Sequence, residues 1–219
     1  MGVLEAGRAT GHVAEHTEVV ITGTGIPSLD PARAGTGVLI RHGEIALHFD
    51  AGRGTAIRVV EAGTDIAEID AMFLTHYHSD HVIGLPDFVL SRWVEDDHDV
   101  GERMAIVAPN GSTIRSCERM LELWDDDLDV RANHNGRSAD PRVDLIGFDT
   151  PDGLVEVWSK GEVRVLAGPV RHEPVVGAVG YRVETPDGVV AISGDTIVCP
   201  EVAALAKGAD VIVYEAIRS

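Results

Sequence analysis

The part of the sequence that decides the fold is the stretch Phe73-Leu74-Thr75-His76-Tyr77-His78-Ser79-Asp80-His81. Three histidines and an aspartate fall here within six consecutive residues, directly after a short apolar run. The apolar run is typical of a buried strand, so the polar cluster is expected on the loop at the end of that strand. Loops held at strand ends are frequent places for binding and catalytic residues. We therefore take this loop as the candidate functional site.

The residue types in this loop indicate metal binding. Imidazole nitrogens and carboxylate oxygens are the ligands that zinc, manganese and iron(II) take in open catalytic sites. His76 and His78 are two residues apart, project the same way from extended backbone, and can share one metal. Asp80 and His81 follow as the chain turns, so they can face a second metal. A polar surface loop without a metal is the alternative, and the ordered pattern after an apolar strand argues against it.

The residues around the loop complete a longer pattern. Thr75 precedes it and Gly84-Leu85-Pro86 follow, giving Thr-His-x-His-x-Asp-His-x-x-Gly-Leu-Pro. This pattern resembles the metal-binding signature of the metallo-β-lactamase superfamily and is most similar to its ribonuclease Z-like branch. The resemblance covers nearly all of residues 18–217. It implies an α/β fold of the αβ/βα four-layer sandwich type, with two packed mixed sheets flanked by helices and the last elements of the fold missing.

The rest of the chain supplies elements for such a fold. Apolar runs at 19–21, 37–40, 45–49, 71–74 and 104–108 predict strands, and helices are expected at 55–62, 85–93, 112–124 and 200–207. From residue 143 onward short strands dominate, and all of them, 143–146 included, are expected in a second sheet. The polar stretch 125–141 is expected to be a surface excursion. Residues 95–99 are expected to form an acidic loop. Most such runs are only solvated, and cation binding is the alternative.

Further ligands come from the resemblance. His172, eight residues before Gly180-Tyr181, matches the third histidine of the family, and Asp195 in Ser-Gly-Asp-Thr matches its metal-bridging aspartate. The residues alone leave His172 open between a ligand and a capping or buried histidine, whereas a strand-tip aspartate is well placed to ligate. Asp50, at the end of a hairpin, either orients a metal ligand or holds its own turn. The metal ligands that the resemblance implies are His76, His78, Asp80, His81, His172 and Asp195.

One feature departs from the family. A last histidine usually completes the second metal, but no histidine follows His172, and Tyr214 stands where the family often has the histidine of His-Glu-Ala. Either the chain is a truncated copy, or water or a partner subunit fills that position. The expected organisation is a poorly ordered segment at 1–17 and one hydrolase domain at 18–219, shortened at its C-terminus. The expected cofactors are two divalent metal ions, zinc first, with manganese or iron as alternatives.

Charge bears on the substrate. Eighteen Lys and Arg against thirty-six Asp and Glu give a net charge of −18, with no basic cluster. Nucleic-acid binders usually carry a basic patch, and an acidic surface repels polyanions. Ribonuclease Z cleaves tRNA precursors at the 3′ end and commonly grips tRNA with a basic arm between the third histidine and the bridging aspartate. The interval from His172 to Asp195 holds two strands and leaves no room for that arm, so the sequence argues against a nucleic-acid partner.

The sequence therefore predicts a metal-dependent hydrolase that uses a dinuclear site and a metal-bound hydroxide on a small ester, lactone, sulfate ester or phosphodiester. Asp80 would ligate, orient the nucleophile and take its proton, and Glu215 would donate a proton. One alternative is a ribonuclease Z-type tRNA 3′-processing endonuclease. Another is a catalytically defective, metal-binding relative without the last ligand. Family members often dimerise, so a homodimer is a further expectation.

Composition and local sequence patterns indicate the cellular compartment of the protein. No run approaches the roughly 18 apolar residues of a membrane span, and the N-terminus lacks the pattern of a secretory signal. Two cysteines, Cys117 and Cys199, give no disulfide framework. We therefore expect a cytoplasmic protein without membrane contact.

Overall fold

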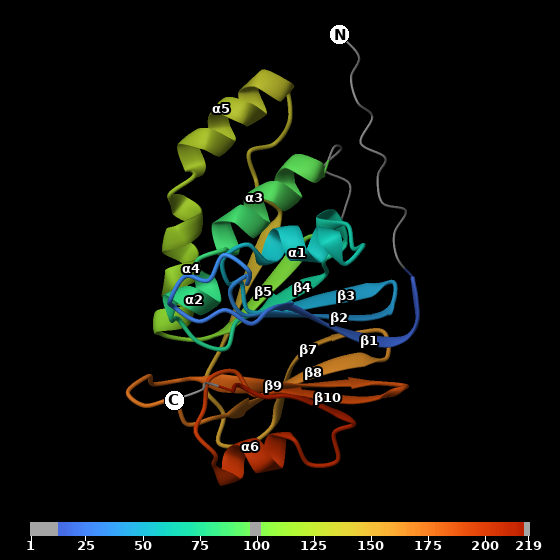
Figure 1. The fold of residues 1–219 in the computed structure, drawn as a ribbon. Coiled ribbons are helices and arrows are strands. Elements are labelled where there is room, and N and C mark those ends of the chain that lie inside the picture. Colours follow the sequence, from blue (N-terminus) through green and yellow to red (C-terminus); the bar gives the residue numbers. More distant parts are fainter. Residues whose placement is uncertain (1–12, 97–101, 217–219) are drawn as a thin grey trace.

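The computed structural model describes residues 13–96 and 102–216 and has two β-sheets packed face to face (Figure 1). Helices α1 to α4 lie on the outer side of one sheet, α5 packs against α3 farther from that sheet, and α6 covers the outer side of the other. This arrangement confirms the predicted α/β class and the layered sandwich of two mixed sheets flanked by helices. Most of the predicted acidic loop, residues 97–99, lies outside the described residues.

The first sheet has six strands in the order β1-β2-β3-β4-β5-β6. Strands β1 to β3 are antiparallel, whereas β3 to β6 run parallel to one another. The bounds are β1 (Ala14–Gly23), β2 (Gly37–Gly43), β3 (Ile45–Phe49), β4 (Ala71–Phe73), β5 (Met104–Pro109) and β6 (Val143–Phe148). The expectation that 143–146 joins the second sheet was wrong, because β6 pairs with β5 after a helical crossover.

The second sheet has five strands in the order β11-β10-β9-β8-β7. Its strands are antiparallel except that β11 runs parallel to β10. The bounds are β7 (Val155–Lys160), β8 (Val163–Pro169), β9 (Val179–Thr185), β10 (Gly188–Ile192) and β11 (Val211–Val213). β11 is thus one edge of this sheet.

The four predicted helices begin and end near the expected positions, whereas α2, α5 and the 3-10 helix η1 were not predicted. The predicted surface excursion at 125–141 contains the helix α5, whose first turn holds three aspartates that suit the positive end of a helix dipole. Gly136 ends this helix with a φ of 66°. The bounds are α1 (Thr55–Glu61), the 3-10 helix η1 (Ile66–Glu68), α2 (Ser79–Val82), α3 (Leu85–Glu95), α4 (Ser112–Glu122), α5 (Asp125–Asn135) and α6 (Pro200–Leu205). No helix in the described ranges is long and apolar enough to cross a membrane.

Aromatic side chains join the two sheets beneath the candidate site. Phe49 of β3 stacks on Phe73 of β4 with ring centroids 4.8 Å apart, and Tyr181 of β9 packs against both rings. The Tyr181 hydroxyl also donates a hydrogen bond of 2.8 Å to the carbonyl of Leu74. The second sheet therefore holds the backbone at the point where the histidine loop begins.

We expect Tyr181→Phe to lower the free energy of unfolding by about 1–3 kcal/mol, because the buried Leu74 carbonyl loses this donor. Urea unfolding followed by circular dichroism measures the change. Tyr214→Phe is the matched control, since the Tyr214 side chain is 40% exposed and should cost less than about 0.5 kcal/mol. Equal effects of the two substitutions would contradict the assigned role of Tyr181.

His48 makes the core sensitive to acid. Its side chain is fully buried, with Nε2 3.0 Å from the Thr22 hydroxyl, and burial lowers its pKa to about 4 despite a backbone contact with Asp50 that acts in the opposite direction. In the unfolded chain the histidine has its ordinary pKa of 6.5, so it binds a proton below about that pH. Between these two values the unfolded chain binds more protons than the folded one, so stability falls as the pH falls.

We expect the urea midpoint to fall between about pH 7 and about pH 5, and His48→Gln to reduce that fall relative to the unsubstituted protein. His134→Gln, on the exposed surface of α5, should leave the pH profile unchanged. A His48→Gln profile that superimposes on the original would contradict this assignment.

Candidate metal centre

The histidine loop leaves β4 and turns directly into α2. His76 and His78 lie on the extended part of the loop, whereas Asp80 and His81 lie in the single turn of α2, which begins after His78. The chain then doubles back against the end of β3, where the Gly84 amide donates to the carbonyl of Ala51. A Cβ atom at Gly84 would lie 2.4 Å from the carbonyl oxygen of Gly52, so only glycine allows this close approach.

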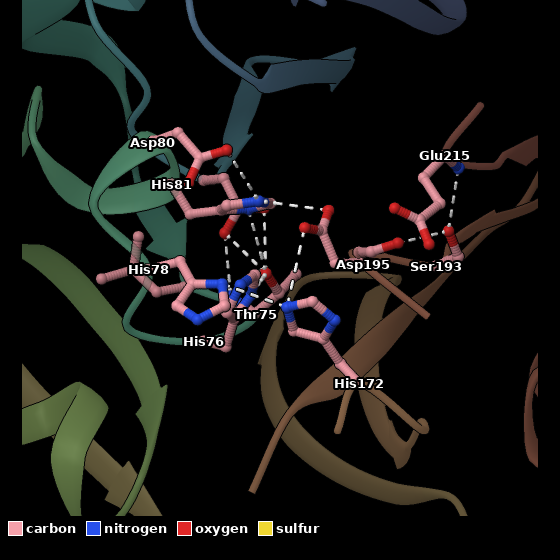
Figure 2. Close-up of polar contacts among 12 residues, drawn as sticks. Thr75, His76, His78, Asp80, His81, His172, Ser193, Asp195 and Glu215 are labelled. Carbon is pink, nitrogen blue, oxygen red and sulfur yellow. Dashed lines mark hydrogen bonds and ion pairs between the residues drawn. The ribbon is translucent and has the colours of Figure 1, made fainter. Parts of the chain in front are cut away.

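The first ligand group comes from both sheets. Donor atoms of His76, His78, His172 and Asp195 all lie within 4.8 Å of one another. Figure 2 shows the three rings converging on one point, with Nε2 of His172 3.0 Å from Nδ1 of His78. Nε2 of His76 is buried and has no hydrogen-bond partner among the described residues. Because this unpaired nitrogen lies among four converging donor atoms, the group fits a divalent metal.

The second group lies on the other side of Asp195. Nε2 of His81 is 3.2 Å from Oδ1 of Asp195 and 3.8 Å from Oδ2 of Asp80. The other oxygen of Asp195, Oδ2, is 3.8 Å from Nε2 of His172. Asp195 therefore presents one oxygen to each group (Figure 2), which is the arrangement of a bridging carboxylate.

Asp50 supports this centre from behind. It has a φ of 57° and accepts hydrogen bonds from both the amide and the hydroxyl of Thr75, at 2.8 to 3.1 Å. Its Oδ2 also lies 2.8 Å from Nδ1 of His81. Of the two sequence interpretations of Asp50, these contacts favour the one in which it orients a ligand, because they turn Nε2 of His81 towards Asp195 and Asp80.

Burial and neighbouring charges act together on the ionisable groups of the centre. Burial opposes protonation of His81, but the carboxylates of Asp50 and Asp195 outweigh it and raise the pKa of His81 to about 10. Burial, together with the charge of His81, lowers the pKa of His76 to about 3. Burial alone would raise the pKa of Asp195, but the neighbouring histidines outweigh it. The pKa of this carboxyl is therefore lowered. His76 is thus ready to ligate as a neutral ring, whereas His81 must release a proton first.

The C-terminal edge strand lies beside Asp195. Glu215 accepts a hydrogen bond of 2.8 Å from the amide of Thr196, and burial raises the pKa of the Glu215 carboxyl, with Asp195 adding to the shift. Tyr214, at the place of the family's last histidine, directs its hydroxyl to the carbonyl of Thr196 at 3.4 Å. This contact engages the Tyr214 hydroxyl with the backbone next to Asp195.

Comparison with known proteins identifies the family. The sequence model described as Metallo-beta-lactamase superfamily matches residues 30–214. The chain belongs to this superfamily, and so to a family of hydrolases. It is 36% identical over 202 residues to the ribonuclease Z of Mycolicibacterium gilvum, a match that covers 92% of this chain and 69% of that protein. This similarity confirms the predicted ribonuclease Z-like branch and shows that the chain is shorter than its relative.

Solved structures show the same fold. The metallo-beta-lactamase fold protein YhfI from Bacillus subtilis aligns with a TM-score of 0.67 and 18% identity, over 90% of this chain and 70% of that one. Human tRNase Z, short form, aligns with a TM-score of 0.65 and 19% identity, over 89% of this chain and 76% of that one. At such identities the likeness supports the architecture alone.

We expect His76→Ala to lower the zinc content measured by elemental analysis after dialysis, because it removes the buried nitrogen at the centre of the first group. Content should fall by about one ion per chain relative to the unsubstituted protein. His134→Ala, on the exposed surface of α5, should leave it unchanged. An unaltered zinc content in His76→Ala would contradict this ligand set.

Proposed function

We propose that the chain is a metal-dependent phosphodiesterase of the ribonuclease Z type, with RNA as its first candidate substrate. The single observation that carries the proposal is the pair of ligand groups that share Asp195. Similarity to ribonuclease Z over nearly the whole chain supports a phosphodiester substrate over the small esters and lactones that the sequence favoured. The same similarity weighs against the earlier expectation that nucleic acid is not a partner.

His76, His78, His172 and Asp195 would hold one divalent cation, and Asp80, His81 and Asp195 would hold a second, with zinc as the first choice. Two bound cations supply Lewis-acid stabilisation of a phosphoryl group and a water of lowered pKa. Asp80 is 7% exposed and lies beside His81 at the edge of the second group, so it can orient the attacking water and accept its proton. Glu215, whose carboxyl has a raised pKa, would hold a proton for the leaving oxygen.

Charge and length favour a second candidate, a small phosphodiester or another small ester. The net charge of −18 opposes the approach of a polyanion. The segment from His172 to Asp195 is filled by β9 and β10 and carries no extended basic arm. A third candidate, a relative that binds metal without turnover, is supported by Tyr214, which stands where the family often has its last histidine.

We expect the zinc-loaded protein to cleave a tRNA precursor at its 3′ end and also bis(p-nitrophenyl) phosphate. Asp80→Ala should lower both rates by about 10²–10⁴-fold, because it removes the proton acceptor. Asp87→Asn, exposed on α3, is the control and should retain both activities. The assay should also include a simple lactone.

The results separate the three candidates. Faster turnover of the small phosphodiester or the lactone, with an intact tRNA precursor, would replace RNA by a small substrate. Full zinc content without turnover of any substrate would favour the defective relative. Full activity of Asp80→Ala would contradict the role of this residue.

A further inference from the structure

A cleft lies apart from the metal centre, among the helices that cover the first sheet. It has a volume of about 240 Å³, is open to solvent and is lined by residues of α3, α4, α5 and β6. Its walls are mainly apolar, and each of these elements supplies a leucine: Leu90, Leu121, Leu128 and Leu145. None of the ligand or supporting residues of the metal centre lines it.

Carboxylates surround this apolar cleft. Glu118 and Glu122 reach it from α4, and Asp125 reaches it from the first turn of α5. All three are exposed, and none forms an ion pair or a side-chain hydrogen bond within the described part of the chain. Asp125 suits the N-terminus of its helix, but Glu122 ends α4, where the helix dipole disfavours a negative charge.

The spacing of the charges indicates what they would bind. Glu118 and Glu122 are four residues apart on one helix, which places them about 6 Å apart along its axis. Two cations one helical turn apart on a partner helix have the same spacing. The cleft is also smaller than the roughly 300–1,000 Å³ of small-molecule sites, so it suits a side chain better than a whole ligand.

We propose that this cleft binds a basic amphipathic helix of a partner protein. An apolar side chain of that helix enters the cleft among the leucines, and lysines or arginines one turn apart pair with Glu118 and Glu122. This is the helix-in-groove mode of recognition, in which apolar anchors provide affinity and flanking charges provide register. Trp124, which is 43% exposed beside the cleft, becomes buried in the complex.

The probe is a designed helical peptide of about 14 leucines and lysines with one apolar face. Binding is measured by calorimetry and by a blue shift of Trp124 fluorescence, with Trp124→Phe identifying the signal. A peptide of the same composition and charge, but with the apolar face scrambled, controls for bulk attraction to an acidic protein. We expect the amphipathic peptide to bind at least about tenfold more tightly than the scrambled one.

The charge requirement is tested with two double variants of equal charge change. Glu118→Gln with Glu122→Gln should weaken binding of the amphipathic peptide by roughly three- to tenfold. Glu44→Gln with Glu162→Gln removes the same charge from exposed turns of the two sheets and should leave binding unchanged. All these substitutions are at exposed positions, so circular dichroism should show an unaltered fold. Absence of binding, equal binding of the scrambled peptide, or equal losses in the two double variants would each overturn the proposal.

Discussion

One buried carboxylate, Asp50, connects the parts of the molecule that make the metal centre. It accepts hydrogen bonds from the amide and hydroxyl of Thr75 and lies 2.8 Å from Nδ1 of His81. The end of β3, the start of the histidine loop and the first turn of α2 thereby meet at a single side chain. A buried negative charge needs several such partners, so the loop cannot move without leaving it unsatisfied. The geometry of His81, and through it that of Asp195, depends on this constraint.

The second constraint is the contact between the sheets. The parallel strands β3 and β4 end at the same edge of the first sheet, beside the ends of β8 and β10 in the second. The aromatic contacts of Phe49, Phe73 and Tyr181 fix the two sheets against each other directly beneath that edge. Because His172 and Asp195 follow β8 and β10, sheet packing delivers them to the histidine loop. The packing of the core therefore also determines the geometry of the site.

Carboxylates take part in two sites with different surroundings, the metal centre and the cleft between α3 and α5. At the metal centre, carboxylates face histidines, and their negative charge is what a pair of cations would neutralise. At the cleft between α3 and α5, the carboxylates face solvent beside apolar walls, so they remain available to a cationic partner. The same residue types thus serve metal binding in one place and surface recognition in another, and their surroundings decide which.

The sequence by itself determined the histidine loop, the class of fold and most helices and strands. These features depend on neighbours in the chain: His76, His78, Asp80 and His81 form a local pattern, and apolar periodicity is also local. The sheet to which β6 belongs was mispredicted, because an apolar strand does not specify its pairing partner. The residues alone left the role of His172 open, and only packing brings its ring to His78. The cleft beside Glu118 and Glu122 could not be foreseen, since it exists only because α3, α4, α5 and β6 pack together. Local patterns fix elements and motifs, whereas pairing, packing and burial decide which of them meet.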